Sequence, residues 1–314
     1  MQILAVLPSF LPVNDIRRSV SALLPEIRIE TDFDAVETEA LETVEVLVVT
    51  AFTPVGKDVI GRLKSVRFIQ VASTGYNNID LQSCRQRGIA VSNIQGANSK
   101  SVAEHVIMCA LVLLRDLKRQ DMLIRNGDWP VISGSFDLAG KIFGIVGMGR
   151  IGREVSSCLV PFEVSTVYYD IVPLDGQEER RLGAVRVELG ELLQNADIIT
   201  LHLPLNAGTR GIISADSLNH MKDGAIIINT ARAELIDYDA LIRYLKAGKI
   251  RAALDVYPQE PPDFSSGLFR EEETVFTPHN AGVTMEAQQR ILAETISNVL
   301  RYIQGKKPLY GVEQ

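Results

Sequence analysis

Three polar side chains in the second half of the sequence form a set that can move a proton beside an anionic substrate. Arg232 follows the apolar run that ends at Asn229, Glu260 follows another such run, and His279 ends the segment Thr277-Pro278-His279. An arginine binds a carboxylate, an imidazole exchanges a proton near neutral pH, and a neighbouring carboxylate tunes that exchange. Each residue also has a structural alternative: a helix-start cation, an exposed loop carboxylate or a strand-end cap. The combination therefore indicates proton transfer more strongly than any single member does.

The other three histidines differ in their expected surroundings. His202 stands near the end of the apolar run Ile198–Leu203, and the carboxyl ends of strands are where open α/β sheets bind ligands. His105 lies in a long apolar stretch typical of a buried helix, and His220 lies in a polar, helix-like stretch. We therefore expect His105 and His220 to be structural residues.

A glycine motif follows the predicted strand Ile142–Val146. Gly147, Gly149 and Gly152 form G-x-G-x-x-G. In a dinucleotide-binding loop the first glycine allows the tight turn, the second lets the backbone approach a pyrophosphate, and the third lets the helix pack close to the sheet. Glycines in a strand-to-helix turn also serve packing alone, so the motif by itself leaves both interpretations open.

Asp170 adds weight to the nucleotide interpretation. It follows the predicted strand Val164–Tyr169, where a carboxylate can accept hydrogen bonds from both hydroxyls of an adenosine ribose. A 2′-phosphate would be repelled there, so we predict NAD(H) rather than NADP(H), although Arg180 and Arg181 are close enough in sequence to fold back. A surface carboxylate at a strand end is the structural alternative. Beside a nicotinamide that delivers a hydride to carbon, the Arg232–Glu260–His279 set supplies what the reduction of a carbonyl needs.

Strands and helices in alternation must position these residues. Before residue 98, four nearly continuous apolar runs indicate buried parallel strands, and six more follow residue 140. The first four are Ile3–Leu7, Val44–Thr50, Val66–Ala72 and Ile89–Asn93. The other six are Ile142–Val146, Val164–Tyr169, Ile198–Leu203, Ala225–Asn229, Ala252–Val256 and Val275–Thr277.

Two long helices are predicted where the chain passes between the two groups of strands. The Ser-x-x-Glu spacing of Ser101 and Glu104 predicts a helix that begins there and continues to Leu114, and Met285–Gln304 predicts a second helix. We predict an α/β protein of two doubly wound, parallel-sheet domains. The first comprises residues 1–98 plus 285–314, and the second, residues 99–284, is inserted in it.

Charge argues against nucleic acid as a partner, and hydropathy argues against a membrane. The 314 residues carry a net charge of −7 at pH 7 and contain no long basic run. The longest apolar run, Val106–Leu114, is about half of what a bilayer crossing requires. The start lacks a positively charged leader, and Cys84, Cys109 and Cys158 show no disulfide or metal-site pattern. We therefore expect a cytoplasmic protein without a metal.

Several motifs in order resemble those of the D-isomer specific 2-hydroxyacid dehydrogenases, and the resemblance covers nearly the whole chain. The motifs are Ser73–Asp80, Ser101–His105, Gly147–Gly152, His202–Leu205, Asn229–Arg232, Leu254–Pro261 and Thr277–His279. The resemblance implies two doubly wound (Rossmann-like/flavodoxin-like) domains, an active site in the cleft between them, and a homodimer formed through the nucleotide-binding domains.

The same resemblance implies the catalytic roles. His279 would be the general acid in reduction and the base in oxidation, and Glu260 would hydrogen-bond it and favour its protonated form. Arg232 would hold the substrate carboxylate and polarise the carbonyl. Backbone groups would bind the other side of the carboxylate, from Ser73, Thr74 and Gly75.

It also implies a set of contacts to NAD(H), in which Asp255 would face the nicotinamide carboxamide. The residues are Thr74, Gly147, Gly149, Arg150, Ile151, Gly152, Asp170, Leu203, Pro204, Thr209, Thr230, Ala231, Arg232, Asp255 and His279. Ala233 departs from the family, which commonly has Gly there. A positive φ at this position would strain an alanine by about 1 kcal/mol or more.

The expected reaction is hydride transfer between NADH and a small 2-oxo acid such as glyoxylate, hydroxypyruvate or a pyruvate-like compound. A phosphoglycerate dehydrogenase of the short type and an NAD-sensing, corepressor-like binding protein are the alternatives. Formate dehydrogenases of this architecture have Gln where Glu260 stands, which disfavours that chemistry. Phe52 would contribute either to an apolar substrate pocket or to simple core packing.

Overall fold

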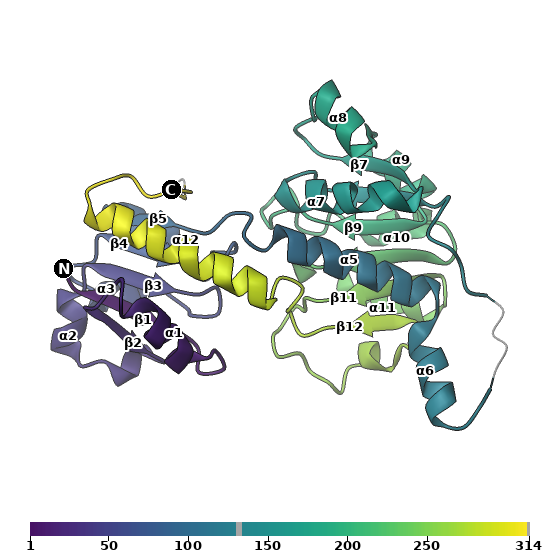
Figure 1. Ribbon diagram of the computed structural model, residues 1–314. Helices are drawn as coiled ribbons and strands as arrows, with labels where there is room; N and C mark the ends of the chain where they lie inside the picture. The colour runs from purple at the N-terminus through teal and green to yellow at the C-terminus, as the bar shows by residue number, and fades with distance from the viewer. Residues whose placement is uncertain (130–133, 313–314) are drawn as a thin grey trace. The chain divides into compact units, whose positions relative to one another are not determined.

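The computed structural model describes residues 1–129 and 134–312, which form two compact units (Figure 1). The first unit contains Met1–Asn98 and the segment that begins at Thr284, and the second is Ser99–Val283. The sequence analysis placed the second domain boundary between residues 284 and 285. In the structure the division falls one residue earlier, between Val283 and Thr284.

The first unit is a five-stranded parallel sheet in the order β2-β1-β3-β4-β5, which is the flavodoxin-like order. The strands are β1 Ile3–Val6, β2 Ile27–Glu30, β3 Val46–Val49, β4 Phe68–Val71 and β5 Ala90–Ser92. Two helices pack on one face, α1 Val13–Val20 and α12 Met285–Ile303. On the other face lie α2 Thr38–Thr43, α3 Lys57–Arg62 and α4 Leu81–Gln86, with the short 3-10 turn η1 Phe33–Ala35.

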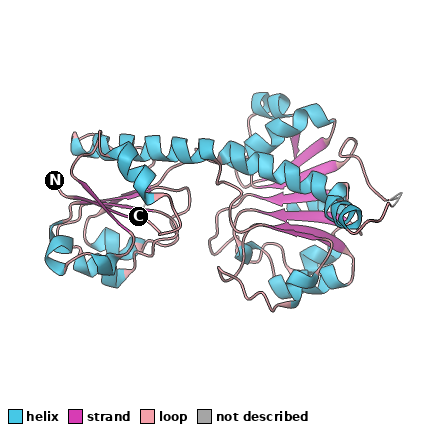
Figure 2. Ribbon diagram, turned by 60° about the horizontal axis from the view of Figure 1, so that its bottom comes forward, coloured by secondary structure: helices cyan, strands magenta, loops and turns pink. Residues whose placement is uncertain are grey.

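The second unit is a seven-stranded parallel sheet in the order β12-β11-β10-β9-β6-β7-β8, which is the Rossmann order with one added strand (Figure 2). Its strands are β6 Ile142–Val146, β7 Ser165–Tyr169, β8 Ala184–Arg186, β9 Ile198–Leu201, β10 Ala225–Asn229, β11 Ile250–Leu254 and β12 Thr274–Phe276. The predicted fold class is thus confirmed.

Helices cover both faces of the second sheet (Figure 2). One face carries α5 Ser99–Leu114, α7 Arg150–Leu159 and α8 Gly176–Leu182. The other carries α9 Leu189–Asn195, α10 Ala215–His220 and α11 Tyr238–Lys246. The remaining elements are α6 Leu117–Arg125 and the 3-10 turns η2 Val160–Phe162, η3 Ala233–Leu235 and η4 Gly267–Arg270.

Two strands escaped the sequence analysis, and both lie at sheet edges. β2 is the outer strand of the first sheet, and only Ile29 of its four residues is buried. β8 is the outer strand of the second sheet, and only Ala184 of its three residues is buried. An edge strand is half-exposed and needs no continuous apolar run, so a search for such runs misses it.

The predicted start of the long helix at Ser101 was wrong. Helix α5 begins at Ser99, and both Ser99 and Ser101 are buried. Ser101 therefore lies inside the first turn rather than at the cap, and the Ser-x-x-Glu spacing is not a capping box here. Among the residues that the structure describes, no helix has the length and apolarity that a membrane crossing needs, and no cluster of three potential metal ligands occurs.

Candidate active site

The glycine motif lies at the point where the strand order of the second sheet reverses, between β6 and β9. Gly147 has φ +102°, and a Cβ there would lie 2.8 Å from the carbonyl atoms of His202. A Cβ on Gly152, in the first turn of α7, would lie 2.2 Å from the Gly147 carbonyl oxygen. A Cβ on Gly149 would meet nothing within 4 Å, which leaves open space beside the backbone. A pyrophosphate-binding loop requires a tight turn at its first glycine, an open approach at its second and close packing at its third, and these three glycines meet those requirements.

Asp170 is tied directly to this loop. Its Oδ2 accepts the Met148 N–H at 2.7 Å, and its Oδ1 accepts the Val172 N–H at 2.9 Å. The side chain remains partly exposed, so its further lone pairs face outward toward a ligand. Arg186, on β8, donates to the backbone oxygen of Asp170 at 3.1 Å rather than to its carboxylate. Arg181, which the sequence left as a partner for a 2′-phosphate, pairs with Glu178 at 3.6 Å.

The loop after β10 contains a buried hydroxyl group with no partner among the described residues, that of Thr230. Asn229 holds the loop by accepting the Ala231 N–H at 3.0 Å and donating to the Arg232 carbonyl at 2.8 Å. A buried polar atom without a partner is uncommon, and at this strand end the Thr230 hydroxyl is available to a ligand. On the neighbouring loop after β9, Thr209 donates to the Pro204 carbonyl at 2.6 Å.

His279 and Glu260 form the pair predicted from the sequence. His279 Nδ1 lies 2.7 Å from Glu260 Oε2, and each side chain is about one-third exposed (34% and 32%). The other oxygen of Glu260 accepts the Tyr257 N–H at 3.0 Å. Burial acts to raise the pKa of Glu260, but the hydrogen bonds from His279 and Tyr257 and the charge of Arg232 outweigh it, so the pKa is lowered. Glu260 is therefore a carboxylate at neutral pH.

Arg232 follows β10 and belongs to the same electrostatic group. Its burial lowers its pKa, while the charges of Glu260 and Glu234 act in the opposite direction. A guanidinium stays charged in spite of such a shift. Its Nη1 donates to the Ala231 carbonyl at 2.6 Å. Ala233 lies in η3, is buried and has no positive φ, so the strain considered for an alanine at this position does not arise.

Asp255 organises the turn that carries His279. Its carboxylate is 2% exposed and accepts the Asn280 and Ala281 N–H groups, both at 2.9 Å, and the Thr277 hydroxyl at 2.6 Å. His279 itself has φ +52°, which costs a residue other than glycine about 1–2 kcal/mol. The hydrogen bonds to Asp255 offset this cost. Sequence analysis missed this role, because the donors become neighbours of Asp255 only when β11 and β12 pair.

His202, near the end of a strand, and His220, at the end of a helix, each have a hydrogen-bonding partner close by in the sequence. His202 Nε2 lies 3.0 Å from the Thr200 hydroxyl, and burial lowers its pKa to about 3, so the ring is neutral. His220, at the end of α10, is exposed and lies 2.8 Å from the Asp216 carbonyl. Both interactions are of the kind that structural histidines make.

In the first unit, the residues predicted to bind the substrate carboxylate follow β4. Ser73 donates its hydroxyl to the Gly75 carbonyl at 2.9 Å, and Asn93 donates to the Thr74 carbonyl at 2.7 Å. Asn78 donates to the Thr50 and Thr53 carbonyls, which ties the loop after β3 to the loop after β4.

The loops after β1 and β3 present two aromatic rings at the point where the order of the first sheet reverses. Phe10 and Phe52 meet edge to face, with ring centroids 5.4 Å apart and planes at 82°. Their exposed fractions are 68% and 49%, so the pair is not core packing. Open α/β sheets bind ligands at such reversal points.

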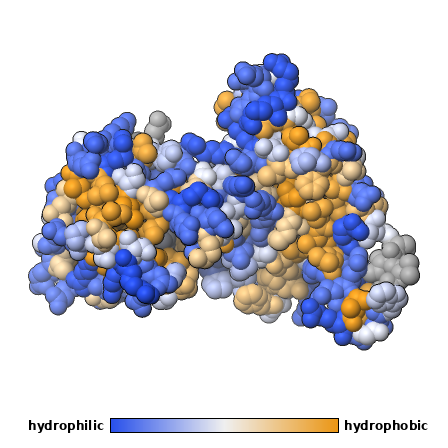
Figure 3. All heavy atoms as spheres, in the orientation of Figure 1, coloured by the Kyte–Doolittle hydropathy of each residue, from blue (hydrophilic) through white to orange (hydrophobic). Residues whose placement is uncertain are grey.

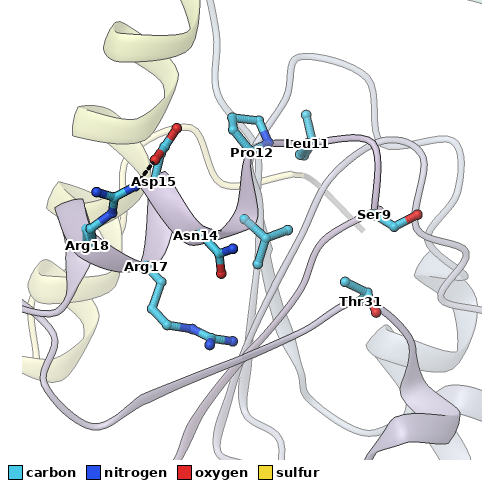
Figure 4. Close-up of a pocket in the computed structure, with 9 residues that line it drawn as sticks. Ser9, Leu11, Pro12, Asn14, Asp15, Arg17, Arg18 and Thr31 are labelled. Atoms are coloured by element: carbon cyan, nitrogen blue, oxygen red, sulfur yellow. Dashed lines mark hydrogen bonds and ion pairs between the residues drawn. The ribbon is translucent and has the colours of Figure 1, made fainter.

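A separate polar groove of about 580 Å³ lies beside α1 (Figure 4). None of the predicted site residues lines it. Its two cations are already engaged, since Arg17 donates to the Ile29 carbonyl at 2.8 Å and Arg18 pairs with Asp15 at 2.5 Å. We assign no function to this groove.

Known proteins are similar to this chain over both of its units. Residues 107–281 match the family model of the D-isomer specific 2-hydroxyacid dehydrogenase, NAD binding domain. The chain is 37% identical to a hydroxypyruvate reductase of Thermotoga maritima over 82% of this chain and 84% of that protein. The chain is also 37% identical to a D-3-phosphoglycerate dehydrogenase of Archaeoglobus fulgidus, but it spans only 50% of that longer protein. The D-lactate dehydrogenase of Aquifex aeolicus, solved with NAD and lactic acid, superposes with a TM-score of 0.88 over 99% of this chain and 100% of that one, at 26% identity.

These matches confirm the cofactor predicted from the glycine loop and Asp170, which is NAD(H). The residues present fit it: the glycine loop has room for a pyrophosphate, Asp170 offers a partly exposed carboxylate, and the hydroxyl of Thr230 lacks a partner within the described chain.

Proposed function

The chain belongs to the D-isomer specific 2-hydroxyacid dehydrogenases, a family of NAD-dependent oxidoreductases, and from this premise we propose that it reduces a small 2-oxo acid with NADH. The observation that carries the proposal is the 2.7 Å contact between His279 Nδ1 and Glu260 Oε2, with the charge of Arg232 acting on the same carboxylate. An acid, its partner and a cation for the substrate are thus grouped at the strand ends of one sheet.

His279 is the general acid in this proposal. Because Nδ1 faces Glu260, the other ring nitrogen, Nε2, is the one that gives its proton to the carbonyl oxygen of the substrate. The Glu260 carboxylate stabilises the imidazolium before transfer and orients the ring. In the oxidative direction the neutral ring accepts the proton of the hydroxyl. NADH, when bound, supplies the hydride to the carbonyl carbon.

Arg232 binds the carboxylate of the substrate and polarises its carbonyl group. A partly buried guanidinium interacts more strongly with an anion than a fully exposed one does. Backbone groups of Ser73, Thr74 and Gly75 are proposed to complete the carboxylate site, with residues 1–98 and 285–314 as the substrate domain and residues 99–284 as the nucleotide-binding domain.

The cofactor contacts proposed from the family resemblance divide into three groups. The glycine loop and the start of α7 hold the pyrophosphate, Asp170 the adenosine ribose, and the strand-end loops the nicotinamide half. The first group is Gly147, Gly149, Arg150, Ile151 and Gly152. The remaining residues are Thr74, Leu203, Pro204, Thr209, Thr230, Ala231, Arg232, Asp255 and His279.

The substrates proposed are glyoxylate, hydroxypyruvate and pyruvate-like 2-oxo acids. The exposed Phe10–Phe52 pair supports an uncharged substrate side chain over a phosphorylated one, because aromatic rings offer a phosphate no compensating charge. This disfavours the phosphoglycerate dehydrogenase alternative, although three relatives carry that name.

We further propose a homodimer formed through the nucleotide-binding domain. Helix α6 has no buried residue, and its apolar side chains Leu117, Met122 and Ile124 are 50–52% exposed. Figure 3 shows hydrophobic residues gathered on this face over α5, next to the largely hydrophilic α6. A helix that buries nothing in its own chain is stabilised when a partner covers its apolar side. The cytoplasmic location stays a prediction.

The direct test is NADH oxidation by the purified protein with glyoxylate, hydroxypyruvate, pyruvate, phenylpyruvate and 3-phosphohydroxypyruvate. We expect turnover of at least one unphosphorylated compound. His279→Ala should lower kcat by about 10²–10⁴ with NADH binding retained. The matched control is His220→Ala, which removes an exposed histidine from α10 and should leave kcat within about twofold. Tight NADH binding without turnover of any compound would instead support the NAD-sensing alternative.

A further inference from the structure

The side chain of His105, on α5, reaches the group of residues that holds the His279 turn. His105 Nε2 lies 3.2 Å from the Thr277 hydroxyl oxygen, and the same hydroxyl lies 2.6 Å from Asp255 Oδ1. The Asp255 carboxylate in turn accepts the N–H groups of Asn280 and Ala281, the two residues that follow His279. A continuous line of hydrogen bonds therefore joins α5 to the turn.

The direction of each bond in this line is determined by the chemistry of its members. A carboxylate only accepts hydrogen bonds, so the Thr277 hydroxyl must donate its single proton to Asp255. Toward His105 the Thr277 oxygen can then only accept, and His105 must carry a hydrogen on Nε2. The ring is thus held as the Nε2–H tautomer by the charge of Asp255, acting through one hydroxyl group.

The surroundings of His105 keep this ring neutral. Burial lowers the pKa of His105 below the ordinary 6.5, although the charge of Asp255 acts to raise it. Cys109, one turn further along α5, also faces Asp255, and burial raises the pKa of its thiol to about 12. Asp255 has hydrogen-bond donors on both of its oxygens.

We propose that His105 is a positioning residue for the reaction, acting on the His279 turn through Thr277 and Asp255. The proposal rests on the proposed role of His279 as the general acid. His279 sits at φ +52°, a conformation that persists only where the surroundings hold it, and Asp255 is the group that accepts from both following N–H groups. The hydrogen bond from the His105 N–H to the Thr277 oxygen holds the Thr277 hydroxyl in place. The hydroxyl in turn fixes the Asp255 carboxylate, and with it the orientation of the His279 ring.

The tautomer is tested without reference to turnover. The sequence has four histidines, so long-range ¹⁵N–¹H spectra of ¹⁵N-histidine-labelled protein are assigned with single variants. We expect a neutral Nε2–H ring for His105 at pH 7, and loss of the tautomer preference in Thr277→Val, which removes the hydroxyl at nearly constant volume. A neutral Nδ1–H ring, or a charged ring, at position 105 in the wild-type protein would overturn the proposal.

The positioning role is tested by kinetics at both ends of the line. His105→Leu should lower kcat about tenfold, because small displacements of a reacting group are costly, and should leave the Kd for NADH within about twofold. His105→Gln places an amide N–H near the position of Nε2 and should restore kcat to within about threefold. Thr277→Val should behave as His105→Leu does and Thr277→Ser as His105→Gln does. The double variant His105→Leu/Thr277→Val should be no slower than the slower single variant, since both break one line.

Ile107→Ala, on the same helix, controls for the loss of buried atoms without a polar partner. It should leave kcat within about twofold. Equal losses in Ile107→Ala and His105→Leu, failure of both conservative variants to restore kcat, or additive losses in the double variant would overturn the positioning role. If His105→Leu fails to fold, His105→Met takes its place, because it also removes the ring N–H while leaving the bond from Thr277 to Asp255 intact. If the wild-type protein turns over no 2-oxo acid, the proposed reaction is wrong, while the tautomer experiment still confirms or refutes the hydrogen-bonded line.

Discussion

Asp170 and Asp255 both follow a strand of the same sheet, and both accept two backbone N–H groups. Asp170 does so at the partly exposed end of β7, with one bond to each of its oxygens. Asp255 is 2% exposed after β11 and takes a third bond, from the Thr277 hydroxyl. The first carboxylate has lone pairs left for an outside ligand, whereas the second is surrounded by donors of its own chain.

The difference separates recognition from positioning. A carboxylate that faces solvent can exchange water for the hydroxyls of a ribose at little cost, and this suits it to select a ligand. A buried carboxylate with three internal donors is expensive to disturb, and this suits it to hold a strained turn in place. The family resemblance suggests cofactor contacts for both residues, but the hydrogen bonds favour holding the His279 turn as the principal task of Asp255.

Replacing each carboxylate by alanine gives the largest expected contrast. Asp255→Ala leaves two N–H groups and one hydroxyl without their acceptor, and should lower the stability of the second unit by about 3 kcal/mol and kcat by about 100-fold. Asp170→Ala leaves only two N–H groups without their acceptor, one of them on the exposed Val172, and should cost about 1 kcal/mol. Urea unfolding followed by far-UV circular dichroism and steady-state kinetics measure both. Equal losses of stability in the two variants would contradict the distinction.

Glu260→Gln should give the next largest loss of kcat, because the Glu260 carboxylate contacts the His279 ring directly. Its pKa is lowered from the ordinary 4.5, so its ionised form contributes at neutral pH and is lost only as the pH falls below that value. We expect kcat to fall by about 10- to 100-fold, a part of what a positioned acid supplies. The wild-type pH profile should show no loss assignable to Glu260 above pH 4.5. A loss of activity between pH 6 and 5 that disappears in Glu260→Gln would show that the carboxylate titrates too high for this role.

Asp170→Ala should change the choice of cofactor rather than the chemical step. Removing the carboxylate takes away the acceptor for the ribose hydroxyls and the repulsion of a 2′-phosphate. We expect the ratio of kcat/KM for NADH to that for NADPH to fall about tenfold, the equivalent of one charged hydrogen bond. Asp255→Ala, assayed with both cofactors, should lower both values by the same factor. A changed ratio in Asp255→Ala would assign that residue to recognition as well.

The continuous apolar runs predicted the central strands of both sheets, because strands buried on both faces need such runs. They failed for β2 and β8, whose outer positions require only one or two buried side chains. In the site, the glycine spacing and the side chains of Glu260 and His279 were recognisable as chemistry. The bonds from Asp255 to Asn280 and Ala281 were not, because they exist only after β11 and β12 have paired. Sequence patterns record residue types along the chain, while a positioning carboxylate is defined by donors that arrive from elsewhere.

Arg186 offers the smallest and most selective test of the comparison. Its guanidinium is exposed on β8 and donates to the backbone oxygen of Asp170, at 3.1 Å from Nη2 and 3.3 Å from Nε, while the Asp170 carboxylate stands in the same loop. We propose that this carboxylate excludes a 2′-phosphate from the wild-type protein, and Arg186→Ala alone should then leave NADPH use within about twofold. Once Asp170→Ala has removed the negative charge, the nearby guanidinium is available to the phosphate. Arg186→Ala should then lower kcat/KM for NADPH by about twofold to fivefold, as expected for an exposed ion pair, and leave NADH unaffected. A double-mutant cycle of Asp170→Ala and Arg186→Ala, measured at low and high salt, tests this dependence. If the Asp170 carboxylate acts on the ligand, the effects of the two substitutions on kcat/KM for NADPH are not additive. If it only shapes its loop, the two effects are additive.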